Sequence, residues 1–514
     1  MKRILCLILC LTLALALFGC GGSQEAAGEP AAVDITGKFS VGFGKVDISP
    51  EQSVYLRGYG DDKKDRMSTM VADPLYATCM AITDATGKTV LMVATDLIGT
   101  GSITFDPVRK LISSTTGVPF DDIMVFGSHN HSGPDFTDPV YQVLLKDRIP
   151  QACQAAMEDR KPAQMYTTFC RPEGYNTVRH YLLTDGSYQG YSVGSVPKNQ
   201  LVGHYGIADN LLQLVKFTRE GGQDIVLINW QGHPKGSSPQ PYTAATSNYV
   251  GILRDTVNAA LGCESLFFLS GSGNVNNSSQ IPGEVSQENY MELGKELGQE
   301  AITAAANFQP ATLDKIQTSI GYLNLQGQKD VAGQKLHAIS IGDLAFVFAP
   351  FEIFDTNAMA VKENSKFPMT FYASCANDSR GYLPTPPSFD WEITYEAGIT
   401  KYPKGTAENV EAIFLELLDG LFAAGGYTQQ PKAEGYITPE FEPYTDGKTY
   451  VIPSAGDLTA YAKVKNGFCQ LVVLDGTQTK VVLALNEAVA QEVLQHETAK
   501  FLYNEQHVIV GVAE

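Results

Sequence analysis

Three of the eight histidines in this 514-residue chain come shortly after apolar runs. His129 and His131 follow the run at residues 123–126, and His233 follows the run at residues 225–230. Neutral imidazole nitrogens are common ligands of Zn²⁺ in proteins. In an extended backbone the side chains alternate between two faces, so we expect His129 and His131 to point to the same side. The pattern indicates a metal site, although each motif alone also fits a hydrogen-bonded structural histidine.

A carboxylate follows a third apolar run. Glu352 comes shortly after residues 344–348, where a solvated loop residue is the alternative interpretation. Two imidazoles and one carboxylate bind Zn²⁺ in catalytic sites that keep a position open for water. Zinc lowers the pKa of that water to about 7 and polarises a substrate carbonyl. These residue types are therefore compatible with metal-assisted hydrolysis.

Apolar runs and helix-like stretches alternate from residue 40 to about residue 425, which favours an α/β fold with a mixed sheet. The expected strands are residues 89–95, 123–126, 225–230, 265–269, 344–348 and 371–374. Pro107 predicts a helix that begins at Asp106, and apolar spacing predicts another helix over residues 407–424. Because α/β sheets place their sites beyond the carboxyl ends of strands, the polar residues there should meet. Asp96, after residues 89–95, is then a candidate to orient a ligand imidazole.

The remainder of the chain has the composition of a linker followed by a small domain. Residues 429–435 fit the linker, and several short strand candidates with a helix at about residues 487–501 predict an α+β fold. The predicted organisation is therefore a signal peptide at residues 1–19, a flexible tether at 20–38, a catalytic domain at 39–428 and a C-terminal domain at 436–514.

The N-terminal segment has the pattern of an export signal. Lys2 and Arg3 precede an apolar run of 15 residues, which is shorter than the roughly 20 that a spanning helix needs. The run ends in Leu17-Phe18-Gly19-Cys20, which resembles a bacterial lipoprotein cleavage site. That resemblance implies lipidation of Cys20 and anchoring on the extracytoplasmic face of the cell membrane. A plain signal peptide is the alternative.

The net charge argues against two classes of partner, and the cysteine spacing argues against one kind of metal site. With 37 Lys and Arg against 56 Asp and Glu, the formal net charge is −19, which argues against a nucleic-acid partner. The same charge disfavours docking on anionic lipid through a basic patch. The six cysteines after Cys20 contain no C-x-x-C pair, so we expect no cysteine-based zinc site. Both disulfides and buried free thiols fit their spacing.

Several short motifs stand in the order that one enzyme family uses. They are residues 41–50 (VGFGKVDISP), 73–77 (DPLYA), 127–134 (GSHNHSGP), 350–352 (PFE) and 381–385 (GYLPT). From residue 40 to about residue 425 the chain resembles the neutral/alkaline (non-lysosomal) ceramidases. Residues 127–134, similar to the family's G-T-H-T-H-S-G-P, carry the most specific match. The resemblance implies a zinc-dependent hydrolase that cleaves an N-acyl amide bond in a small-molecule or lipid substrate.

The resemblance also implies roles for individual residues. The residues that match the family's zinc ligands are His129, His233, Glu352 and Tyr382. His131 matches a histidine that faces the substrate without binding zinc, Arg179 matches the arginine of the site, and Tyr395 matches a tyrosine behind the ligands. On this assignment His131 passes a proton to the leaving amine, and Arg179 or a tyrosine hydroxyl stabilises the oxyanion.

The chain departs from the family after residues 265–269. Where ceramidases have G-D-V-S-P-N, Asn274 replaces the aspartate, Asn276 the serine and Asn277 the proline. An asparagine amide can donate to an oxyanion but is no nucleophile, so Asn276 remains a site residue in a changed role. The C-terminal segment also does not resemble the larger immunoglobulin-like domain of the family.

Three interpretations follow from the sequence. The first is a membrane-tethered zinc amidohydrolase, and the second is an inactive relative that binds a ligand or protein partner. The third is a zinc hydrolase that cleaves an ester or peptide. A serine esterase is not expected, because the G-x-S-x-G match at residues 190–194 follows a polar turn rather than a buried strand.

Overall fold

The computed structural model describes residues 34–59, 66–190, 196–235, 242–284, 289–324, 333–391, 394–453 and 461–513. The expected signal peptide, most of the tether, and residues 191–194 of the G-x-S-x-G match lie outside these ranges. Residues Ile35–Glu514 form one compact unit. No helix in the described part of the chain is long and apolar enough to cross a membrane.

The largest sheet in the described residues is mixed and has nine strands. They are β1 (Ser40–Asp47), β3 (Tyr76–Thr83), β4 (Thr89–Thr95), β5 (Ile123–Gly127), β6 (Lys161–Cys170), β11 (Leu212–Arg219), β12 (Asp224–Trp230), β14 (Cys263–Leu269) and β16 (Gln309–Ala311). Their order is β14-β12-β11-β6-β1-β3-β4-β5, with β16 paired to β6. The outermost pairs, β14/β12 and β4/β5, are parallel, and the pairs between them are antiparallel.

A second, four-stranded sheet packs against the first. Its strands are β17 (Ile316–Leu323), β18 (Gln334–Ile341), β19 (Leu344–Phe348) and β21 (Met369–Ala373), of which β19 and β21 are parallel. The facing sides of the two sheets share one hydrophobic core, in which the rings of Phe126 and Phe268 stack with centroids 4.5 Å apart. Val90 and Met92 of β4 face this core while Leu91 faces helices, which explains the unbroken apolar run of this strand.

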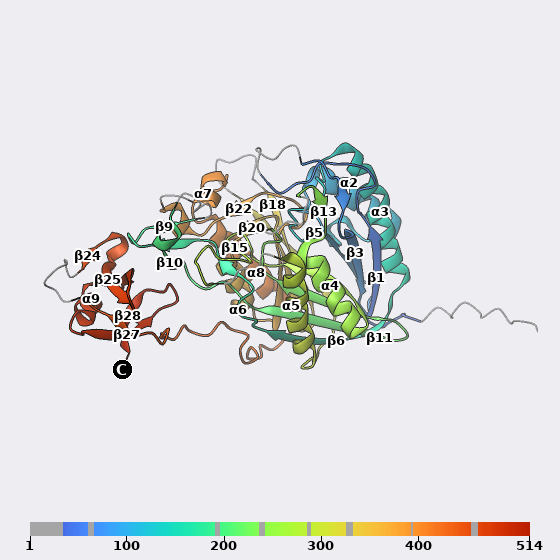
Figure 1. Ribbon diagram of the computed structural model, residues 1–514. Helices are drawn as coiled ribbons and strands as arrows, with labels where there is room; N and C mark the ends of the chain where they lie inside the picture. Colours follow the sequence, from blue (N-terminus) through green and yellow to red (C-terminus); the bar gives the residue numbers. More distant parts are fainter. Residues whose placement is uncertain are drawn as a thin grey trace, which may run out of the picture. The chain divides into compact units, whose positions relative to one another are not determined.

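Helices cover both outer faces. The α-helices in the described residues are α2 (Ser102–Thr116), α3 (Pro139–Glu158), α4 (Asn248–Leu261), α5 (Tyr290–Ala305), α6 (Asp355–Asn364), α7 (Tyr395–Ile399), α8 (Thr406–Gly425) and α9 (Glu487–Val493), and six of them lie on these faces. Helices α2 and α3 pack on the β1–β5 half of the large sheet, and α4 and α5 pack on its β11–β14 half (Figure 1). Helices α6 and α8 cover the four-stranded sheet. The result is a helix–sheet–sheet–helix arrangement, and the predicted mixed α/β class is confirmed.

A short segment joins the two ends of the large sheet. The Ser374 N–H donates to Leu269 O at the end of β14 (2.8 Å), and the Asn377 N–H donates to Val125 O of β5 (2.7 Å). The Asn377 side chain accepts from the Val125 N–H in return (2.9 Å). Cys375 and Asn377 have φ values of 53° and 58°, a left-handed backbone that turns the segment sharply. The segments after β5, β12 and β14 therefore end up next to one another.

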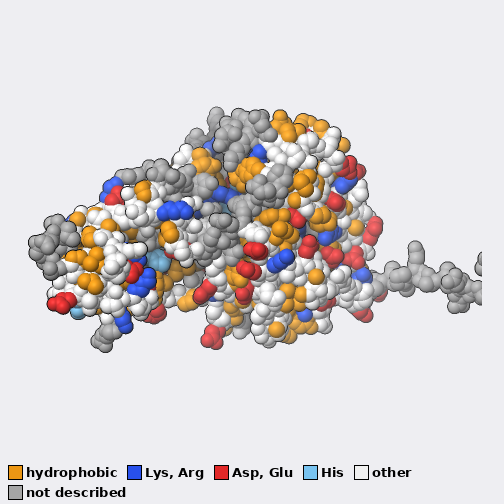
Figure 2. Space-filling view, in the orientation of Figure 1, with side chains coloured by type: hydrophobic (Ala, Val, Ile, Leu, Met, Phe, Trp, Pro, Cys, Tyr) orange, Lys and Arg blue, Asp and Glu red, His pale blue; other side chains and the backbone are white. Residues whose placement is uncertain are grey.

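Short strand pairs surround these strand ends. They are β2 (Met70–Val71) with β13 (Ala244–Ala245), β7 (Thr177–Val178) with β15 (Val275–Asn276), and β20 (Glu352–Ile353) with β22 (Tyr382–Leu383). A three-stranded sheet holds β8 (Tyr181–Leu183), β9 (Tyr188–Gln189) and β10 (Leu201–His204). Charged side chains of both signs are interspersed over the described surface that Figure 2 shows.

The C-terminal part forms a six-stranded sheet with its own hydrophobic cluster. Its strands are β23 (Tyr450–Val451), β24 (Ala462–Lys463), β25 (Cys469–Asp475), β26 (Gln478–Ala484), β27 (Thr498–Tyr503) and β28 (Ile509–Ala513). The predicted helix at residues 487–501 is wrong beyond Val493, because Ala499, Phe501 and Tyr503 alternate into the cluster as strand β27. The domain boundary at residue 436 stays a prediction.

Two further expectations are settled by the structure. Helix α2 begins at Ser102 rather than Asp106, because burial of Phe105 extends the helix and places Pro107 inside it. The six cysteines after Cys20 are free thiols.

Candidate metal centre

His129, His131 and His233 converge at one buried point. One ring nitrogen from each lies within 4.8 Å of the others, and all three residues are buried. The ring centroids are 4.5 to 5.0 Å apart. The Nε2 atoms of His131 and His233 approach to 2.8 Å. The sequence prediction that these histidines meet at strand ends is therefore confirmed.

The backbone that brings His129 and His131 together is not extended, which corrects the geometric reason for their convergence. His129 has φ 62°, a left-handed conformation that is rare for a residue with a Cβ. The N–H groups of His129 and Asn130 both donate to Leu97 O, and the His131 N–H donates to Pro234 O (3.1 Å). The turn after β5 is thus held against the ends of β4 and β12.

Backbone carbonyls orient two of the imidazoles. His129 Nδ1 lies 2.8 Å from Ile98 O, and His233 Nδ1 lies 3.2 Å from Ser272 O. A carbonyl only accepts, so each Nδ1 carries a hydrogen and each Nε2 points to the centre. His129 Nε2 lies 3.1 Å from Glu352 Oε2, which is ion-pair distance.

Burial and charge set the protonation of the three rings. Burial, followed by the proximity of His129, lowers the pKa of His131 and of His233 well below the ordinary value. Burial also lowers the pKa of His129, but the Glu352 carboxylate outweighs it and raises that pKa well above the ordinary value. The His131 and His233 rings are therefore neutral at pH 7, whereas the His129 ring is protonated and forms an ion pair with Glu352.

Glu352, Tyr382 and Arg179 lie side by side next to the histidines. Glu352 is directly opposite Tyr382 across the parallel β20/β22 pair. The Arg179 guanidinium donates to Tyr382 Oη (3.3 Å) and to Gly273 O (2.6 Å). Tyr395 is 42% exposed, and its ring centroid lies 5.8 Å from that of Tyr382. The structure thus gathers the residues that the family resemblance singled out.

Sequence reasoning missed Glu396, which binds Arg179, and His180, which binds Glu396. Glu396 accepts from Arg179 Nε through Oε1 (2.7 Å) and from His180 Nε2 through Oε2 (3.1 Å), and all three are fully buried. Burial raises the pKa of Glu396, but Arg179 and His180 outweigh it and hold that pKa at about 2. The only sequence signal that could have found them is that His180 directly follows Arg179 and Glu396 directly follows Tyr395. Cys375, whose Sγ lies 3.4 Å from His129 Nδ1, had no such signal.

Asp96 does not orient a ligand imidazole, which corrects that expectation. Its Oδ2 accepts from Arg254 Nη2 (2.6 Å) and from the Tyr76 N–H (2.8 Å). Asp96 therefore neutralises a buried arginine and fixes β3, while the carbonyl of Ile98 orients His129.

The three asparagines after β14 have different surroundings. Asn274 donates to Asp355 Oδ1 (2.7 Å) and accepts from the Asp355 N–H (2.9 Å), which ties this loop to the start of α6. Asn277 donates to His233 O (2.9 Å). Asn276 lies opposite Thr177 in the β7/β15 pair, and its Oδ1 is buried without a described hydrogen-bond partner. Asn274 and Asn277 thus support the loops of the site.

The residues present fit a divalent metal ion. His129 Nε2 and Glu352 Oε2 face each other at 3.1 Å, and His233 Nε2 is directed to the same centre, so one ion could bind all three atoms. Imidazole nitrogens with a carboxylate and a phenol oxygen suit zinc among the common metals.

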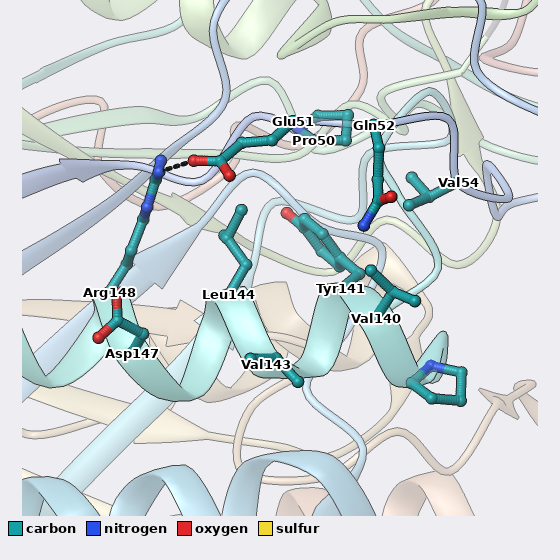
Figure 3. Close-up of a pocket in the computed structure, with 11 residues that line it drawn as sticks. Pro50, Glu51, Gln52, Val54, Val140, Tyr141, Val143, Leu144, Asp147 and Arg148 are labelled. Atoms are coloured by element: carbon teal, nitrogen blue, oxygen red, sulfur yellow. Dashed lines mark hydrogen bonds and ion pairs between the residues drawn. The ribbon is translucent and has the colours of Figure 1, made fainter.

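A cavity of about 640 Å³ lies elsewhere, between α3 and the segment after β1 (Figure 3). Val140, Val143 and Leu144 of α3 supply much of its lining, and an ion pair between Glu51 and Arg148 lies at one end. None of the residues of the metal centre lines this cavity, and Gln52, Tyr141 and Asp147 add polar groups to its walls.

Comparison with known proteins places the fold. No family model and no curated protein matches the chain. A neutral ceramidase from Pseudomonas aeruginosa matches with a TM-score of 0.60 and 14% identity, over 86% of this chain and 92% of that one. A structure described as ceramidase complexed with C2 matches with a TM-score of 0.61 and 13% identity, over 87% and 93%. The predicted resemblance is confirmed in three dimensions: the chain has the fold of the neutral ceramidases.

Proposed function

We propose that the chain is a zinc-dependent hydrolase that cleaves an N-acyl amide bond. The observation that carries the proposal is the arrangement of His129, His233 and Glu352. Two imidazoles whose tautomers are fixed by carbonyls direct Nε2 atoms towards the centre, where one of them meets a buried carboxylate oxygen at 3.1 Å. These three residues, with Tyr382 beside Glu352, would hold the metal ion.

The residues around this group have distinct tasks in the reaction. Bound zinc would supply Lewis-acid polarisation of the carbonyl and a lowered pKa for water. His131 is neutral because burial lowers its pKa, so it can accept a proton from water and deliver it to the leaving amine. Arg179 stays positively charged beside Glu396 and can stabilise the negative charge that develops on the carbonyl oxygen.

The substrate class follows from the fold and from Asn276. Similarity to neutral ceramidases supports a substrate with an N-acyl amide, either a lipid or a smaller molecule. Asn276 stands where those enzymes have a serine, which favours an amide other than ceramide itself. Lipidation at Cys20 would hold the enzyme on the extracytoplasmic face of the membrane, close to lipid substrates.

The experiment is a substrate panel with the soluble form that starts after Cys20. Long-chain N-acyl amines including ceramide, the matching esters and short peptides are incubated with enzyme, with and without a chelator. We expect cleavage of an amide, loss of activity on chelation and recovery with Zn²⁺, and no activity in His233→Ala. Cleavage of esters or peptides alone would overturn the amide assignment, and full activity in His233→Ala would overturn the metal mechanism.

The matched control is His337→Ala. His337 is 3% exposed and does not belong to the group of His129, His131 and His233. Its replacement therefore removes a buried histidine without changing the site. Activity lost equally in both variants would mean that folding, rather than the metal site, decides the result.

A further inference from the structure

Arg66 contacts the main chain of His131 directly. Its Nη1 donates to His131 O (3.1 Å), while its Nε and Nη2 donate to Tyr242 O (3.3 and 3.1 Å). Arg66 is only 5% exposed. One guanidinium therefore links the turn that carries His131 to a second segment 111 residues further along the chain.

Two tyrosine rings enclose this guanidinium. Its central carbon lies 4.7 Å from the ring centroid of Tyr59 and 4.3 Å from that of Tyr242. The Tyr59 ring also meets the imidazole of His131 edge-on, with centroids 5.3 Å apart. The negative face of an aromatic ring attracts a cation, and the attraction is stronger where water is excluded, so Arg66 fixes Tyr59, and Tyr59 in turn flanks His131.

The surrounding backbone leaves His131 little freedom. The Leu56 N–H donates to Arg66 O (2.8 Å), and strands β2 and β13 pair just beyond Arg66 and Tyr242. Gly58 packs so closely that a Cβ atom there would lie 2.6 Å from His131 Cα. The Arg66 side chain thus contacts three separate segments, which carry Tyr59, His131 and Tyr242.

We propose that Arg66 is a positioning residue for His131. It holds the main chain of His131 through the carbonyl and holds the imidazole through Tyr59. The consequence for proton transfer rests on the proposed function, whereas the restraint on His131 does not. Displacement of a catalytic group by about 1 Å costs as much as 100-fold in rate, so this restraint matters for turnover.

Arginine is the residue that suits this position. Its planar guanidinium presents donors on two edges while both faces remain free to stack on rings. A lysine ammonium is a point charge without a plane, so it cannot reach both carbonyls and stack on both tyrosines. Arg66→Lys should therefore retain the charge but only part of the restraint.

The test compares Arg66→Met and Arg66→Lys with Arg57→Met. Arg57 belongs to the same region, but its side chain is 43% exposed and pairs with Asp135 (2.9 Å), so it serves as the matched control. The first measurement is the rate at which diethyl pyrocarbonate modifies His131 in metal-free protein, located by peptide mass spectrometry. We expect about tenfold faster modification in Arg66→Met, a smaller increase in Arg66→Lys and no change in Arg57→Met.

Kinetics on the amide substrate supply the second measurement. We expect kcat to fall about tenfold or more in Arg66→Met with KM nearly unchanged and the zinc content intact. A His131 modification rate within about twofold of the parent in both Arg66 variants would overturn the proposal. Because the modification assay needs no substrate, it remains decisive if the panel reveals no cleavage. Where Arg66→Met does not fold, Arg66→Lys carries the test.

Discussion

The Nε2 atoms of His131 and His233 lie 2.8 Å apart in a buried site. His233 carries its hydrogen on Nδ1, facing Ser272 O, so in the metal-free chain its Nε2 accepts from His131. A metal ion bound at His233 uses the same lone pair as this hydrogen bond. Metal binding would therefore compete with the contact between the two rings, and on the proposed function it would release His131 for proton transfer.

The first prediction concerns protons released on zinc binding. The pKa of His129 is raised in the metal-free chain by Glu352, so this ring is protonated at pH 7 and must lose its proton before it can bind zinc. Zinc affinity should therefore rise with pH, by about tenfold per unit for one released proton. Calorimetric titration in buffers of different ionisation enthalpy measures the number of protons released for each zinc ion bound. Release of no proton at pH 7 would contradict the assignment of His129.

The second prediction concerns acid stability and Glu396. Its pKa is about 2 in the folded chain against an ordinary value of 4.5, so its stabilisation is complete above pH 4.5 and is lost as pH falls towards 2. The difference corresponds to about 3 kcal/mol at pH 7. Glu396→Gln leaves Arg179 buried without its carboxylate and should cost about 3–5 kcal/mol at pH 7. Urea unfolding at pH 7 and pH 3 measures the free energy of unfolding of the parent chain and of Glu396→Gln.

The gap between the parent chain and Glu396→Gln should shrink by about 2 kcal/mol at pH 3, because the parent has lost part of this stabilisation. Glu442→Gln, at an exposed position, is the control and should leave stability unchanged at both pH values. An equal gap at both pH values would show that Glu396 is not held at a low pKa.

The third prediction concerns the glycine before His233. A Cβ atom at Gly232 would lie 2.4 Å from Asn277 Oδ1 and 2.9 Å from Trp230 Nε1, both of which are buried. Gly232→Ala should therefore cost about 1–3 kcal/mol and shift His233, with zinc affinity reduced about tenfold or more. Thermal unfolding and competition with a zinc chelator measure the two effects. The control, Gly420→Ala, adds its Cβ to open space on helix α8, and unchanged zinc affinity in both variants would refute the argument.

The fourth prediction concerns Asn274, which the sequence resemblance aligns with an aspartate of the ceramidases. Asn274→Asp would place a carboxylate against Asp355, whose own pKa is already raised by burial. The variant should lose about 2–4 kcal/mol at pH 7, and the loss should diminish as pH falls and one carboxyl is protonated. Urea unfolding at pH 7 and pH 5 measures the free energy of unfolding of Asn274→Asp and of the control Asn274→Ala. A variant as stable as the parent at pH 7 would contradict this explanation of the replacement.

Some elements were predictable because one physical signal dominated. Strand β4 is apolar throughout because both of its faces are buried, and its predicted and observed bounds coincide at residues 89–95. Helix α8 has an apolar face and ends at a glycine, so its prediction was right within one residue at each end. These signals are local, which is why a single sequence carries them.

Other features depend on contacts that no local pattern reveals. The left-handed His129 follows from its hydrogen bond to Leu97 O, and the start of α2 from the burial of Phe105. The role of Asp96 depends on Arg254, which lies 158 residues further along the chain. His129, His233 and Glu352 were found because each follows a recognisable apolar run, whereas Glu396 acts through two residues brought to it only by folding.

The most direct test of the central claim is the metal content of the purified soluble form, measured by elemental analysis beside His233→Ala and His337→Ala. The account predicts about one zinc ion per chain in the parent and in His337→Ala, and none in His233→Ala. A parent chain that contains no metal and takes up no zinc on addition would contradict the account, and so would full zinc occupancy in His233→Ala.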